Sequence, residues 1–195
     1  TYFMREPKHF DFLREKILPN IKPEWGRISY QIWCAGCSSG EECYTLAMLL
    51  QDYKDQGGWL PSFSIVGTDI SEQALAVAQK GRYPVRELEN IPALWQQKYL
   101  SMDEAGTSFD IGRAIREKVR FQRMNLLKPS VGLGQYDLVL CRNVMIYFNE
   151  ESRKKLIEKL YRALKPGGYL FVGHTELLPR NHELFEYVCP AVYRK

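Results

Sequence analysis

The sequence has no apolar run that approaches the ~18 residues needed to span a bilayer. Its opening residues, Thr-Tyr-Phe-Met-Arg, are not the basic segment followed by a long apolar stretch that marks a secretory signal. Internal repeats and low-complexity tracts are also lacking. We therefore expect a soluble, cytoplasmic, globular protein.

A strong excess of charge and a disulfide framework are absent as well. The formal net charge of +4 is well short of the basic excess typical of nucleic-acid-binding proteins, although it would suit an acidic protein partner. The five cysteines are odd in number, and Cys34, Cys37 and Cys43 crowd into one segment. We expect free thiols and no nucleic-acid partner.

The 195 residues, 45% of them apolar, are enough for one core and too few for two full domains. Apolar spacing predicts helices over 7–18, 41–56, 71–81 and 149–165, and strands over 29–34, 63–69, 119–121, 136–141, 169–173, 185–188 and 191–194. This alternation predicts an α/β fold with a doubly wound, mostly parallel sheet. Ligands of such sheets bind beyond the carboxyl ends of the strands, where the strand order reverses. Residues 82–118 break the alternation and are interpreted as an inserted subdomain.

A loop with two glycines, Ala35 to Glu42, follows the first expected strand and opens a helix. Glycine lets a ligand approach the backbone, and the helix start presents free N–H groups. The loop lacks the three glycines of a dinucleotide fingerprint and ends in Glu41 and Glu42. These carboxylates would repel a pyrophosphate but attract the ammonium and sulfonium charges of S-adenosylmethionine (AdoMet). Alternatively, they only complement the helix dipole.

Polar side chains stand at the ends of the next three expected strands. Asp69 could accept hydrogen bonds from both hydroxyls of a ribose, or it could cap the turn before Ser71. Asn125 and Asn143 follow the third and fourth strands, at the same edge of the predicted sheet. Together with the glutamates, these residues suit a nucleoside ligand that has no phosphate.

The Cys34-x-x-Cys37 spacing must be weighed as a metal site, but it has no second pair and no nearby histidine to complete four ligands. We expect no metal, with Cys34 in the core and Cys37 beside the cofactor. His9 and His182 have no evident companions and are interpreted as surface or structural residues. His174 could line the substrate entrance.

Six segments occur together in this chain: Thr1–Arg5, Ala35–Tyr44, Thr68–Ile70, Asn125-Leu126, Cys141–Phe148 and Gly173–Glu176. Together they resemble the CheR-type methyltransferases, which esterify glutamates of bacterial chemotaxis receptors. The resemblance implies one class I, Rossmann-like AdoMet-dependent methyltransferase domain over residues 1–195. It implies that 82–118 are a small inserted β-subdomain, which in some members docks a receptor's C-terminal peptide. The AdoMet contacts it implies are Thr1, Arg5, Ala35, Glu41, Asp69, Asn125, Leu126, Asn143 and Val144.

The resemblance also implies that Arg5 and Tyr147 lie nearest the transferable methyl group. Two positions depart from the family: Met4 replaces a usual second Phe, and Cys43 replaces a common Pro. We expect the family's N-terminal helical domain to be absent from this chain. Because the chain starts at Thr1, inside a motif, we expect it to be cut from a longer one.

We predict a protein-glutamate O-methyltransferase that forms methyl esters on cytoplasmic receptor helices, releases S-adenosylhomocysteine and acts as a monomer. A glutamate with a pKa of about 4.3 is already ionised at neutral pH, so the reaction needs no general base. Arg5 is the candidate clamp for the carboxylate, and Tyr147 either orients it or packs in the core.

Two alternatives stay open. One is an AdoMet-binding regulatory module without turnover. The other is a nucleic-acid base N-methyltransferase, because Asn143-Val-Met-Ile-Tyr147 is loosely similar to the Asn-Pro-Pro-Tyr motif that grips a flipped base.

Overall fold

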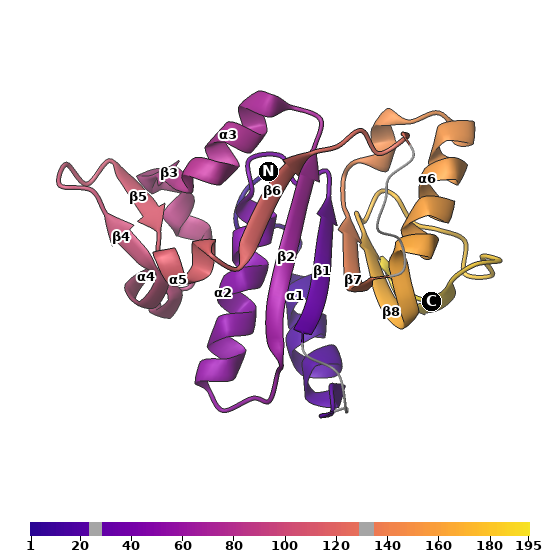
Figure 1. Cartoon of the computed structure of the whole chain (residues 1–195), viewed down its shortest axis with the longest axis horizontal. Coiled ribbons are helices and arrows are strands. Elements are labelled where there is room, and N and C mark those ends of the chain that lie inside the picture. The colour runs from indigo at the N-terminus through magenta and orange to yellow at the C-terminus, as the bar shows by residue number, and fades with distance from the viewer. Residues whose placement is uncertain (24–28, 129–134) are drawn as a thin grey trace.

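A single seven-stranded sheet runs through the molecule, in a computed structural model that describes residues 1–23, 29–128 and 135–195 (Figure 1). Its strand order is β6-β2-β1-β7-β8-β10-β9. The strands are β1 (Ser29–Ala35), β2 (Ser62–Asp69), β6 (Val119–Arg123), β7 (Tyr136–Cys141), β8 (Leu164–Val172), β9 (Glu186–Cys189) and β10 (Val192–Arg194). The strands from β6 to β8 are parallel, and β10 pairs antiparallel with both β8 and β9. The predicted doubly wound, mostly parallel sheet is confirmed, and its order reverses between β1 and β7.

One helical segment precedes β1, and three further helices follow β1, β2 and β7. The first begins as α1 (Pro7–Phe12) and continues through a π turn (Leu13–Ile17) and a 3₁₀ turn (Leu18–Asn20); the others are α2 (Glu41–Asp55), α3 (Glu72–Lys80) and α6 (Glu150–Ala163). Ser71 and Asn149, the first residues of two predicted helices, cap α3 and α6, because their side chains accept hydrogen bonds from the N–H groups of Ala74 and Ser152. Within the described residues, no helix combines the length and apolar character that crossing a bilayer requires.

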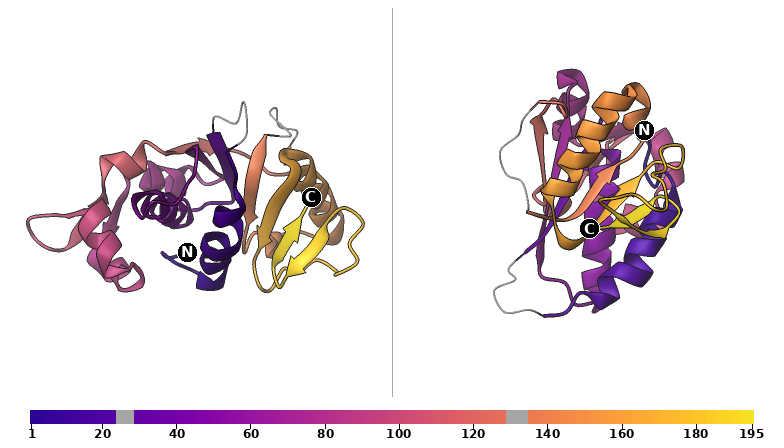
Figure 2. Two further views of the ribbon diagram at one scale, coloured as in Figure 1. Left: turned by 90° about the horizontal axis from the view of Figure 1, so that it is seen from below. Right: turned by 90° about the vertical axis from the view of Figure 1, so that its right-hand side faces the viewer.

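The side chains of β1 alternate between two cores on opposite faces of the sheet. Ile32 and Cys34 pack in the core that includes residues of α1 and α2, whereas Trp33 and Ala35 pack in the core that includes α6. Helices α1 and α2 therefore cover one face and α6 covers the other (Figure 2).

A second, three-stranded antiparallel sheet lies at one end of the molecule, on the left in Figure 1. Its order is β3-β5-β4, and its elements are β3 (Arg82–Pro84), a 3₁₀ turn (Val85–Asn90), α4 (Ala93–Tyr99), β4 (Leu100–Met102), β5 (Ser108–Ile111) and α5 (Arg113–Arg116). Tyr83 of β3 connects it to the loop after β1, since its hydroxyl donates to the Ser39 carbonyl at 2.6 Å. The ring of Phe3 packs edge-on against Tyr83 at 5.0 Å.

The end of α6 differs from the prediction. The predicted helix over 149–165 included Leu164, but this residue is the first of β8, opposite Tyr136 of β7. The helix ends at Ala163 because the chain must turn before Pro166, whose ring disfavours a helical conformation in the preceding residue. Gly167 then adopts a φ of 78°, and its N–H donates to the carbonyl of Lys195 at 2.9 Å.

Candidate functional site

A cavity of about 560 Å³ opens beyond the carboxyl ends of β1, β2, β6 and β7. This volume lies within the ~300–1,000 Å³ of typical small-molecule sites. The cavity is at the strand-order reversal, where the fold class places its ligands. Its wall includes Thr1, Tyr2, Arg5, Phe10, Gly36, Cys37, Ser38, Glu42, Asp69, Asn125, Leu126, Arg142, Asn143, Val144 and Tyr147.

Ala35 and Glu41 are the two candidate site residues that do not line this cavity. Ala35 is the last residue of β1 and is buried in the core. The Glu41 carboxylate is also buried, which raises its pKa, and it accepts the Ser39 hydroxyl at 2.8 Å. Consecutive residues of a helix point about 100° apart, so only one of the two glutamates can face the cavity, and here it is Glu42.

The loop after β1 is fixed to the end of β2 and lies against Val144. The N–H groups of Gly36 and Cys37 both donate to the Thr68 carbonyl, at 2.7 and 2.9 Å. Gly36 has a φ of 79°, and a Cβ added there would lie 2.4 Å from a Val144 methyl carbon. Glycine is therefore required at this position both by backbone conformation and by the close approach of Val144.

Asp69 fills the turn-capping role that the sequence offered for it, and it also lines the cavity. One carboxylate oxygen accepts the Ser71 N–H at 2.9 Å and so caps the turn before α3. The other accepts the Ser38 N–H of the β1 loop at 2.8 Å. Since a carboxylate has about four acceptor positions and Asp69 also lines the cavity, it retains capacity for a ligand's hydroxyl groups.

A buried guanidinium joins the N-terminal segment to the cavity wall. Arg142 donates to Glu42 at 3.1 Å, to Glu6 at 3.4 Å and to the carbonyl of Arg5, and it lies 5.3 Å from the centre of the Phe10 ring. Its side chain is only 2% exposed. Burial raises the pKa of Glu42, whereas the positive charge of Arg142 opposes that rise.

Arg5 and Tyr147 reach the cavity from opposite parts of the sequence. Among the described residues, no carboxylate lies within ion-pair distance of the Arg5 guanidinium, so its charge is available to a ligand. The Tyr147 side chain is 81% exposed. The alternative that Tyr147 is a core-packing residue is therefore wrong.

Glu176 supports the segment that follows β7, although its role was not predicted. It is buried, and its carboxylate accepts the N–H groups of Asn143 at 2.5 Å, Gly173 at 3.0 Å and Ile146 at 3.1 Å. Asn143 itself has a φ of 59°, a left-handed conformation that this residue type tolerates. The Gly-His-Thr-Glu segment could have signalled this role, but sequence spacing does not show which N–H groups it meets.

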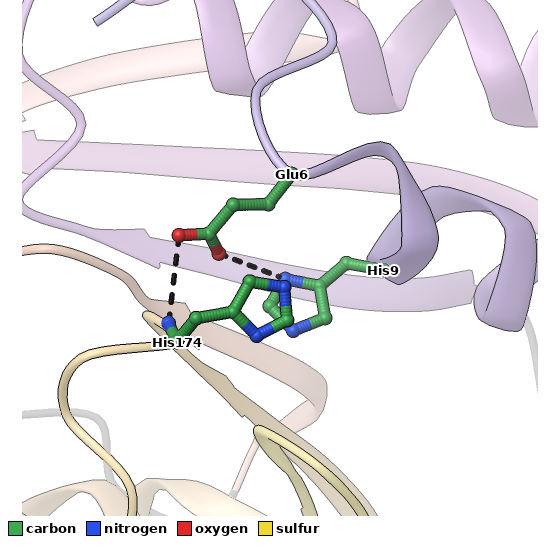
Figure 3. A group of neighbouring side chains, drawn as sticks. All are labelled: Glu6, His9 and His174. Carbon is green, nitrogen blue, oxygen red and sulfur yellow. Dashed lines mark hydrogen bonds and ion pairs between the residues drawn. The ribbon is translucent and has the colours of Figure 1, made fainter.

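Two histidines differ from what the sequence indicated, because His9 has companions and His174 lies outside the cavity wall. His9 is 1% exposed and has two companions, Glu6 and His174, as Figure 3 shows. Burial, with the charge of Arg142 and the neighbouring His174, lowers the pKa of His9 to about 3, so its imidazole is neutral at pH 7. His174 is exposed and does not line the cavity.

All five cysteines are free, as expected. Burial raises the pKa of Cys34 to about 12, so this thiol stays protonated. Within the described residues, no cysteine belongs to a group of three or more potential metal ligands. The described residues thus add no further ligands to the Cys34-x-x-Cys37 pair.

A family model described as the CheR methyltransferase SAM-binding domain matches residues 1–193. The chain belongs to the CheR methyltransferase family. A chemotaxis protein methyltransferase of Borreliella burgdorferi is 40% identical over 100% of this chain and 70% of its own length. Chemotaxis protein methyltransferase 1 of Pseudomonas aeruginosa is 32% identical over 100% of this chain and 73% of its own. Chemotaxis protein methyltransferase 2 of Vibrio cholerae is 34% identical over 95% and 64%.

Membership in the CheR family confirms the predicted resemblance and the assignment as an AdoMet-dependent methyltransferase. AdoMet and SAM are the same compound, so the family's SAM-binding domain corresponds to the predicted cofactor. The individual cofactor contacts remain predictions.

Proposed function

We propose that this protein transfers the methyl group of AdoMet to glutamate side chains on the cytoplasmic helices of chemotaxis receptors, forming methyl esters. The observation that carries the proposal is the cavity at the strand-order reversal, which brings the carboxylates of Glu42 and Asp69 together with the guanidinium of Arg5. The chemotaxis methyltransferases among its relatives support the choice of substrate. We place this activity in the cytoplasm.

The cavity suits AdoMet better than a nucleotide with phosphates. Two carboxylates face it, and one of them, Glu42, stands in the first turn of α2, where a phosphate would otherwise bind. Asp69 would accept hydrogen bonds from the ribose hydroxyls, and Glu42 would attract the ammonium or sulfonium charge. Thr1, Asn125, Leu126, Asn143 and Val144 would complete the contacts. When bound, AdoMet supplies an electrophilic methyl group.

Positioning of the substrate carboxylate is assigned to Arg5 rather than Arg142. Arg142 already donates to two carboxylates and a carbonyl, and it is almost fully buried. Arg5 is partly exposed and can hold a carboxylate in a fixed geometry without exchanging a proton. Tyr147, exposed at the cavity edge, would orient the same carboxylate through its hydroxyl. Orientation and partial desolvation of an already ionised nucleophile would then supply most of the rate.

The small antiparallel sheet is proposed to dock a receptor's C-terminal peptide in receptors that have one. Strands β3 and β4 are its two edges, and edge strands carry unpaired backbone groups that an extended peptide can join. The protein is proposed to act as a monomer.

A methyl-transfer assay tests the proposal. The chain would be incubated with radiolabelled AdoMet and cytoplasmic receptor fragments, and the label released by mild base would be counted. We expect base-labile esters that disappear when the receptor's methylated glutamates are replaced by alanine. Arg5→Ala should reduce turnover roughly 100-fold while changing AdoMet affinity much less.

The same assay separates the alternatives. AdoMet binding without any ester on receptor fragments would indicate a regulatory module. Methylation of oligonucleotides, together with salt-dependent binding to them, would indicate a base methyltransferase. Full turnover by Arg5→Ala would remove Arg5 from the mechanism.

A further inference from the structure

We propose that Glu6, His9 and His174 form a binding site for one divalent metal ion of the zinc type. The three residues come from the turn before α1, from α1 itself and from the segment after β8 (Figure 3). Each offers one ligand atom, and these atoms all lie within 4.8 Å of one another. Two ligands of a tetrahedral zinc ion are ~3.4 Å apart, so small side-chain rotations would bring these three together around an ion.

His9 is the residue that points to a ligand. It is 1% exposed, yet neither of its ring nitrogens has a hydrogen-bond partner among the residues that the structure describes. Its Nδ1 lies 3.5 Å from a Glu6 carboxylate oxygen, which is beyond the usual length of a hydrogen bond. A buried polar group without a partner destabilises the folded state, and coordination of a metal would satisfy it.

The backbone turns Glu6 toward the histidines. Glu6 has a φ of 56°, which is unfavourable for a residue with a Cβ and persists only where the surroundings impose it. Its carboxylate lies between His9 and the backbone N–H of His174, which donates to it at 3.4 Å. Since His174 is exposed and Glu6 is partly exposed, an ion could enter from solvent without opening the core.

The donor set determines the class of ion. Two imidazoles and one carboxylate suit zinc and neighbouring transition metals, with water in the remaining position, and are poor ligands for calcium or magnesium. Arg142 competes for Glu6 at 3.4 Å, but its charge is already balanced by Glu42 at 3.1 Å. The expectation of no metal rests on Cys34 and Cys37, which take no part in this group.

Cobalt(II) provides a direct probe, because its visible absorption reports the ligand geometry and a thiolate ligand adds a separate charge-transfer band. The reduced protein, freed of metal by a chelator that is then removed, would be titrated with Co²⁺ and afterwards with Zn²⁺. We expect one Co²⁺ per chain, no thiolate band, and displacement by Zn²⁺. The chain has three histidines, so His182→Ala is a matched control that removes the one outside the group.

His174→Ala should weaken Co²⁺ binding at least tenfold, because loss of even an outer-shell partner of a metal ligand costs about 10–100-fold. Glu6→Gln, which keeps the shape of the side chain, should weaken binding as well, whereas His182→Ala should bind as the unchanged protein does. The proposal would be overturned by the absence of a visible cobalt spectrum, by a thiolate band, or by equal binding in His174→Ala and His182→Ala. None of these readouts depends on methyl transfer.

Discussion

At the scale of single residues, the site depends on two arginines that have different tasks. Arg142 is buried, and it ties α2 to the N-terminal segment through Glu42, Glu6 and the carbonyl of Arg5. That connection places the partly exposed Arg5 at the cavity. Arg142 therefore has a structural role, and the guanidinium of Arg5 is left available for substrate.

A substitution of Tyr147 tests whether its hydroxyl orients the substrate. Because its side chain is 81% exposed, Tyr147→Phe should leave the free energy of unfolding within about 0.5 kcal/mol of the original. If the hydroxyl orients the carboxylate, the change should reduce kcat/KM by an amount equivalent to about 1–3 kcal/mol. Steady-state kinetics and urea unfolding measure the two effects, and unchanged kinetics would leave the hydroxyl without a role.

A substitution of Glu176 tests whether its hydrogen bonds hold the segment after β7 that lines the cavity. Glu176→Gln keeps the shape of the side chain but places an amide N–H₂ against backbone N–H groups that now donate to a carboxylate. We expect the free energy of unfolding to fall by about 1–3 kcal/mol and AdoMet affinity to fall with it, since Asn143 and Val144 line the cavity. The exposed Glu183→Gln serves as control; equal behaviour of the two variants would contradict the assignment.

Residue types were readable from the sequence here, but side-chain directions were not. The sequence contained both glutamates at the start of α2, and only the helix geometry shows that Glu42 faces the cavity. The group around His9 was not predictable either. Glu6 lies nearby in the sequence, but only the fold brings the distant His174 beside both residues.

At the scale of elements, the loop after β1 is fixed by its contacts with the segment after β7 and with the end of β2. Gly36 lies against Val144, and the loop's N–H groups are held by Thr68 at the end of β2. The edge of the cavity is therefore built from three neighbouring strands at once.

Gly36→Ala tests this approach, with Gly57→Ala as a matched control. Both glycines have left-handed backbones, with φ of 79° and 86°, but an added Cβ meets Val144 at 2.4 Å in one and nothing within 4 Å in the other. Each change should cost about 1–2 kcal/mol for conformation, and Gly36→Ala should cost about 1–3 kcal/mol more for crowding, with weaker binding of S-adenosylhomocysteine. If urea unfolding showed equal losses of unfolding free energy in the two variants, Val144 could move aside without destabilising the protein.

Most elements were predictable because their signals are local. Caps such as Ser71 and Asn149 fix helix starts within a few residues, and apolar runs such as Tyr136–Cys141 are typical of buried strands. The end of α6 was not, because whether Leu164 continues a helix or starts β8 depends on pairing with β7. The individual strands within 82–118 were not predicted either, because they are only three or four residues long and β3 pairs with the distant β5.

At the scale of the whole molecule, the sheet separates two cores, and α1 closes one of them with a buried histidine. His9 stacks on Phe171 of β8 with 5.1 Å between the ring centres, so the N-terminal segment is held against this strand. The placement of Arg5 at the cavity thus depends on packing across the full fold. This dependence makes global stability sensitive to the protonation of one imidazole.

The pH dependence of unfolding follows from that burial. The pKa of His9 is lowered from 6.5 to about 3, so below pH 6.5 the unfolded chain binds a proton that the folded chain does not. The free energy of unfolding should therefore fall as the pH falls. Between about pH 7 and 5.5, His9 should account for about 1 kcal/mol of the loss.

Urea unfolding at these two pH values, with a chelator present, measures this contribution. The loss should be about 1 kcal/mol smaller in His9→Gln than in the original protein, and unchanged in His182→Gln. The same loss in His9→Gln and in the original protein would show that His9 does not resist protonation.

The most direct test of the central claim is a calorimetric titration of the protein with AdoMet and with S-adenosylhomocysteine. We expect both to bind at one site, and we expect Asp69→Asn to weaken both because the cavity would lose a charged acceptor. Absence of binding by both compounds to the folded protein would contradict the account.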